Sequence, residues 1–160
     1  RYRYQMQKTL DMQFRDNKVN EQIVPDRQVQ EYLSTHPMTG LLSAAQLGKA
    51  MKAEQVLHIQ LEPISRDSSM LEPTARFQLA ATVRVIDVHS RNQLWPVESA
   101  GRSVVFTLKT SEMHSAEENE ELNDKALAEG LATQIAKLFY KHWIKPGEDS
   151  GQQTEAYGLK

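Results

Sequence analysis

Histidine is the residue type in this chain best suited to acid–base or metal chemistry, and the chain has five of them. No two histidines stand four residues apart and no H-E-x-x-H sequence occurs, so the helical zinc-binding pattern is absent. The chain also has no cysteine, which excludes disulfides, thiolate zinc sites and cysteine nucleophiles within it. We therefore predict no metal site and no cofactor, and interpret the histidines as surface or helix-end residues: His36, His58, His89, His114 and His142.

Acidic residues between Glu117 and Asp124 form the second group that could do chemistry. A cation site there is one interpretation, but the run lacks the glycine and the ligand spacing of a calcium loop. Carboxylates in the first turns of a helix also suit the positive end of the helix dipole. We interpret the run as the solvated start of a helix.

Nucleophile and phosphate motifs are incomplete. Leu47-Gly48-Lys49 lacks the upstream glycine and the following serine or threonine of a phosphate loop. Ser103, Ser111 and Ser115 lack the G-x-S-x-G elbow. Asp87 ends a predicted strand beside a turn, where an aspartate bonds nearby backbone N–H groups, so we favour a turn-stabilising role over catalysis. We predict no catalytic residue and expect that the chain is not an enzyme.

Length and charge set further bounds. The chain has 160 residues and a net charge of −2, which fits one domain and gives no basic footprint for nucleic acid. No apolar run approaches the ~18 residues that a membrane span needs. We predict a single domain over residues 1–145 and a flexible polar tail over 146–160. Because the chain begins with arginine, we expect that it was processed or trimmed, so that any targeting segment lies upstream.

Alternation of apolar and polar residues predicts three strands, at 55–64, 75–88 and 93–108, the last one interrupted at 99–102. In the first two strands one face is clearly apolar and the other is mixed. This pattern is typical of an antiparallel sheet that helices cover on one side. The predicted covered face comprises Leu57, Ile59, Leu61, Phe77, Leu79, Ala81, Val83 and Val85.

Helical periodicity surrounds these strands, at 1–16, 26–35, 43–52 and 116–143, with a short strand predicted at Gln22–Val24. Asp26 is a candidate helix cap, and Ser43 with Gln46 has the spacing of a capping box, as does Ser115 with Glu118. Gly48 weakens its helix by roughly 1 kcal/mol relative to alanine, which suggests close packing there. The predicted fold is α+β, in the order α-β-α-α-β-β-β-α, with a mostly antiparallel sheet of three to four strands and helices chiefly on one face.

Three stretches carry a family resemblance: Leu47–Ile64 (LGKAMKAEQVLHIQLEPI), Thr82–Pro96 (TVRVIDVHSRNQLWP) and Ala126–Phe139 (ALAEGLATQIAKLF). Together they resemble the superfamily of the curli-secretion lipoprotein, the penicillin-binding-protein activator lipoprotein and the N-terminal domain of TolB. Within it, uncharacterised lipoproteins of planctomycete type are the most similar. The resemblance implies a periplasmic-side envelope protein, membrane-anchored in its full-length form by a lipid on a cysteine that this chain lacks. It brings no catalytic residue with it.

The function expected from these observations is a non-enzymatic protein-interaction module of the cell envelope, the soluble part of a lipoprotein, with a protein partner of unknown identity. The alternatives are a subunit of an oligomeric secretion or envelope assembly, and a small ligand-binding or enzymatic domain. Trp95 and Trp143 could be interface anchors or core residues, and core is the favoured interpretation. The candidate interaction surface is Val56, His58, Thr82, Arg84, Ile86 and Trp95.

Overall fold

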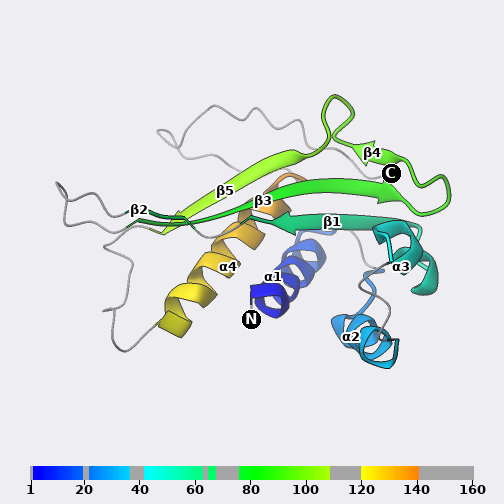
Figure 1. Ribbon diagram of the computed structural model, residues 1–160, viewed down its shortest axis with the longest axis horizontal. Helices are drawn as coiled ribbons and strands as arrows, with labels where there is room; N and C mark the ends of the chain where they lie inside the picture. The colour runs from blue at the N-terminus through cyan, green and yellow to red at the C-terminus, as the bar shows by residue number, and fades with distance from the viewer. Residues whose placement is uncertain are drawn as a thin grey trace.

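The structure is a computed structural model that describes residues 2–19, 22–36, 42–62, 65–67, 76–108 and 120–140. Its helices are α1 (Tyr2–Asp16), α2 (Asp26–Thr35), α3 (Ala44–Ala50) and α4 (Glu120–Lys137), and its strands are β1 (Gln55–Leu61), β2 (Ser65–Asp67), β3 (Arg76–Asp87), β4 (Gln93–Trp95) and β5 (Arg102–Leu108). In this part of the chain the strands form one antiparallel sheet, and α1 and α4 lie against one of its faces (Figure 1). The predicted α+β class is confirmed.

Strand β3 is the centre of the sheet, because every other strand pairs with it. β1 pairs with residues 81–87 of β3 and β2 with residues 76–78, while β5 pairs with residues 77–83. Since β5 shares partners with both β1 and β2, it must occupy the opposite edge of β3, as β4 also does. The sheet is therefore three rows wide, with β1–β2 and β4–β5 as interrupted outer rows. The three predicted strands correspond to these rows, and the predicted break at 99–102 separates β4 from β5.

Two local predictions are wrong. Residues 22–24 form no strand, since they have no partner strand in the described chain and β-propensity is overridden without one. Asp26 does not cap α2: it is the first helical residue, and Pro25 occupies the cap position without a side-chain hydrogen bond. The capping box that starts α3 is confirmed, because the Gln46 N–H donates to Ser43 Oγ and the Ser43 N–H donates to Gln46 Oε1.

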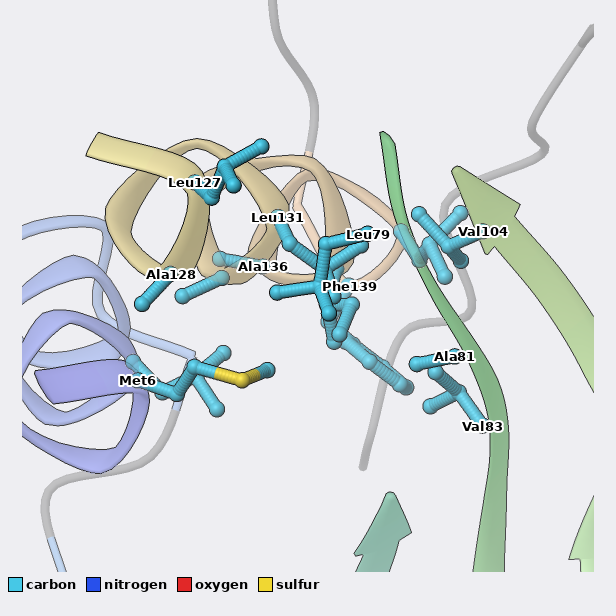
Figure 2. Packing of buried hydrophobic residues seen from close by; sticks show 14 of the residues in the cluster. Met6, Leu79, Ala81, Val83, Val104, Leu127, Ala128, Leu131, Ala136 and Phe139 are labelled. Carbon is cyan, nitrogen blue, oxygen red and sulfur yellow. The ribbon is translucent and has the colours of Figure 1, made fainter. Parts of the chain in front are cut away.

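The hydrophobic core lies between the sheet and the α1–α4 pair (Figure 2). The apolar face of β3 is buried as predicted, with Val83 fully covered. Leu61 was predicted on the covered face, but this prediction is wrong, because Leu61 is 38% exposed at the end of β1, beyond the area that the helices cover. The buried cluster comprises Met6, Leu10, Leu79, Ala81, Val83, Val85, Val104, Leu108, Leu127, Ala128, Leu131, Ala132, Ile135, Ala136, Leu138 and Phe139.

Small residues let α4 approach the sheet closely. A Cβ atom at Gly130 would lie 2.3 Å from ring atoms of Phe106 on β5. The helix ends at Lys137, earlier than the predicted Trp143, because the chain tightens into i→i−3 bonds at Leu138 and Phe139. Residues 116–119 and 141–143, the second capping box and the 146–160 tail lie outside the described residues.

Candidate functional site

The mixed face of the sheet, opposite α1 and α4, gathers five of the six predicted surface residues. Cross-strand register places Val56 opposite Ile86, His58 opposite Arg84, and Gln60 opposite Thr82. These positions alternate with the covered residues of the same strands, so their side chains point to the other side of the sheet. We call this surface the outer face, and define it by Val56, His58, Gln60, Thr82, Arg84, Ile86 and, on β5, Val105.

Trp95 does not belong to the outer face. It lies opposite Val85, whose side chain is buried in the core. The ring of Trp95 meets that of Phe139 at 5.3 Å between centroids, in an edge-on arrangement. The favoured core interpretation of Trp95 is therefore confirmed, and its place in the interaction surface is corrected. Trp143 lies outside the described residues.

The pair of His58 and Arg84 is the polar centre of the outer face. Arg84 Nε donates a hydrogen bond to His58 Nδ1 at 3.3 Å. An imidazole nitrogen accepts only when it carries no proton, so this bond requires the neutral ring with its proton on Nε2. Burial and then the positive charge of Arg84 lower the pKa of His58, which favours the same neutral state.

On either side of the His58–Arg84 pair along the strands, the backbone of a glycine lies close to a side chain of the outer face. A Cβ at Gly48 would lie 2.5 Å from Cγ2 of Val56, so α3 packs against the β1 end of the face. A Cβ at Gly101 would lie 2.3 Å from Cγ2 of Thr82. The close packing predicted at Gly48 is thus confirmed, and in the register of β1 and β3 the His58–Arg84 pair falls between these contacts.

A hollow of about 510 Å³ is the second candidate site, and no sequence pattern predicted it. It lies where the C-terminal end of α3, the start of β1 and the β3–β4 turn meet. Lys49, which lines one wall, belongs to the Leu47-Gly48-Lys49 stretch that lacks the residues of a phosphate loop. Its charged and titratable lining residues are Lys49, Lys52, Glu54, Asp87, His89 and Arg91.

Asp87 at the rim of this hollow has the turn-stabilising role that was predicted. Its Oδ2 accepts a hydrogen bond from the backbone N–H of Ser90 at 2.6 Å. Hydrogen bonds from Ser90 lower the pKa of Asp87, because they stabilise the carboxylate form. Asp87 is therefore an ionised anchor of the β3–β4 turn.

The remaining histidines of the described chain lie apart from one another. The ring of His36 stacks on Tyr32 at the end of α2, with centroids 4.2 Å apart, and His89 is exposed in the β3–β4 turn. His114 and His142 lie outside the described residues. Among the residues that are described, no cluster of three His, Cys, Asp or Glu side chains could hold a metal ion. No helix in these segments has the length and apolarity to cross a membrane.

Comparison with known proteins gives one distant structural similarity. No protein-family model and no curated protein matches the chain. The crystal structure of lipoprotein GNA1162 from Neisseria meningitidis is similar at 17% sequence identity and a TM-score of 0.44, over 71% of this chain and 73% of that one. A similarity of this size assigns neither a family nor a function to the chain.

Proposed function

We propose that this chain is a non-enzymatic protein-interaction module of the cell envelope and that the outer face is its contact surface. The observation that carries the proposal is the Arg84–His58 pair, with apolar Ile86 next to Arg84 on the sheet face that α1 and α4 leave free. Val105 lies farther along the same face, opposite Ala80. Arginine is enriched among the residues that dominate protein–protein binding energy.

The geometry of Arg84 defines the partner that this surface would recognise. Its Nε is held by His58, while its two terminal nitrogens make no hydrogen bond or ion pair within the described segments. A guanidinium that is oriented through Nε presents its remaining N–H groups to a carboxylate. The proposed partner is therefore a protein that places an aspartate or glutamate among apolar side chains.

The envelope location rests on the resemblance of Leu47–Ile64, Thr82–Pro96 and Ala126–Phe139 to the curli-secretion lipoprotein superfamily. That resemblance implies a periplasmic-side module that a lipid holds to the membrane in the full-length protein. A module tethered in this way meets its partner at the membrane surface, so no spanning helix is required of it.

Site-specific photo-crosslinking in the native organism tests the contact surface. A photoreactive residue at Val105, on the outer face, is compared with one at Met12 on α1, because both positions are 52% exposed. We expect a discrete adduct with one envelope protein from position 105 only, and expect Arg84→Glu to abolish it.

Three outcomes would contradict the proposal: the same adducts from both positions, an adduct at 105 that survives Arg84→Glu, or recovery of the full-length protein in the cytosol. An adduct between two copies of this chain would instead favour the alternative of an oligomeric assembly subunit.

A further inference from the structure

We propose that the hollow between α3 and the β3–β4 turn binds a small soluble phosphate ester through Lys49, Lys52 and Arg91. Two lysines from the end of α3 and one arginine from the turn line the same space. The hollow has a volume of about 510 Å³ and opens to solvent, so its exposed cations are accessible to a soluble ligand. Lysine and arginine are the side chains that bind phosphate oxygens best in proteins. The hollow adjoins the outer face at α3 but is lined by none of the residues that define that face, so the inference does not depend on the proposed function.

Backbone conformation sets two of these cations apart. Lys52 has φ 56° and Arg91 has φ 62°, in the left-handed region that glycine or asparagine adopts with less strain. Lys52 closes α3 in the position where glycine is the usual residue, with the Ala53 N–H donating to the Gly48 carbonyl at 2.9 Å. Strained residues are concentrated at functional sites, and two of the three non-glycine residues with positive φ in the described chain line this hollow, Lys18 being the third.

The charged side chains of the hollow form no ion pairs with one another in the described structure. Glu54 and Asp87 also line it, yet neither forms an ion pair with the three cations in the described structure. Asp87 is engaged by the backbone of Ser90. The three cations therefore form no ion pair with the carboxylates of the hollow, and the carboxylate of Glu54 is an acceptor for hydroxyl groups of a ligand. This combination favours a phosphorylated polyol over a simple inorganic anion.

The walls of the hollow are fixed before any ligand arrives. The Val88 N–H donates to the Glu54 carbonyl at 2.9 Å, which ties the end of β3 to the residue before β1. The Asp87 N–H donates to the Asn92 carbonyl at 2.9 Å, which closes the turn that carries Arg91. Preorganised walls reduce the entropy lost on binding.

Glucose 6-phosphate is the probe, with glucose and sodium sulfate as controls at equal ionic strength, and binding is followed by NMR chemical-shift titration at low salt. We expect saturable shifts at α3 and the β3–β4 turn with glucose 6-phosphate, and much weaker ones with either control. No saturable shift below about 10 mM, a Kd at the weak end of specific binding, would overturn the proposal.

Substitution by glycine separates a ligand role from a backbone role. Lys52→Gly and Arg91→Gly relieve the left-handed strain, and Lys18→Gly is the matched control, because Lys18 has φ 55° but does not line the hollow. We expect all three variants to raise the Tm by about 3 °C. Only the first two should weaken binding, each by about tenfold.

Lys49→Gln extends the test to a cation with ordinary helical geometry, and we expect the same loss of affinity with an unchanged Tm. Equal affinity in wild type, Lys52→Gly and Arg91→Gly would overturn the proposal, as would an equal loss in Lys18→Gly. Arg84→Glu on the outer face should leave the binding of glucose 6-phosphate unchanged.

Discussion

The two faces of the sheet are made by the same strands and the same backbone ladders, yet they differ in what each residue contributes. On the covered face, Leu79, Ala81, Val83 and Val85 are between 0 and 4% exposed and touch the helices. On the outer face the neighbouring residues of β3 are all partly exposed. Burial of side chains on the covered face therefore contributes most of the free energy of folding. Residues of the outer face contribute less, so they can form a recognition surface.

The His58–Arg84 pair on the outer face contributes little to stability. The hydrogen bond from Arg84 to His58 is long at 3.3 Å and partly exposed, so its net contribution to folding is small. Folding alone would accept many other residues at these two positions. The covered face allows no such exchange, because its side chains fill the space between β3 and α4.

Introducing a carboxylate on each face has the largest expected effect on the comparison between the covered face and the outer face. We expect Val83→Asp to unfold the domain, because it removes a fully buried side chain and leaves an unpaired charge, at a cost of at least about 4 kcal/mol. Val105→Asp is the matched control, with the same substitution at a side chain that is 52% exposed on the other face. Circular-dichroism melts should show a cooperative transition for Val105→Asp only. A parental Tm for Val83→Asp would refute the assignment of the covered face.

Gly130→Ala tests how closely α4 approaches the sheet. Alanine would favour the helix by about 1 kcal/mol, but its Cβ would meet the ring of Phe106, and overpacking costs about 1–3 kcal/mol. We expect net destabilisation in urea unfolding. Phe106→Leu should partly rescue it, so that the double variant is more stable than the sum of the single changes predicts. An alanine variant more stable than the parent would show that the ring of Phe106 can shift to make room for the Cβ atom.

Arg84→Ala should change the stability by no more than about 0.5 kcal/mol, as expected for a surface substitution. The same variant should lose the crosslink from position 105 to the partner. A large drop in Tm would show instead that Arg84 stabilises the fold of the sheet.

The smallest effect is a dependence on pH through His58. Its pKa is lowered in the folded state, so the unfolded chain takes up the proton first as the pH falls. Stability is then fully present above the unfolded pKa near 6.5 and declines as the pH drops through that value. We expect the decline to be about 0.5 kcal/mol or less, because the pair is partly exposed and screened. Chemical denaturation at pH 7.5 and 5.5 should show it in wild type and not in His58→Gln.

Sequence reasoning succeeded where short-range rules decide. Alternation identified the buried residues of β3, and the spacing of Ser43 and Gln46 identified the cap of α3. Gly48 was correctly linked to close packing, and Asp87 to its turn. The strand alternation, the cap and the turn depend on residues within a few positions of one another, so the pattern itself contains the information. For Gly48 the sequence indicated close packing but not its partners, Val56 and Val88.

Long-range geometry decided the rest. The strand pattern favoured a core position for Trp95, but its partner Val85 is set by a shift in the β3–β4 register that the sequence does not predict. The hollow joins Lys49 and Lys52 to Arg91, about forty positions away, and only the antiparallel return of β3 along β1 brings them together. The chain by itself determined the α+β class and the apolar face of its strands, since periodicity is local. The tertiary structure decided which face α1 and α4 leave free and where the cations converge, because both depend on how distant segments pack.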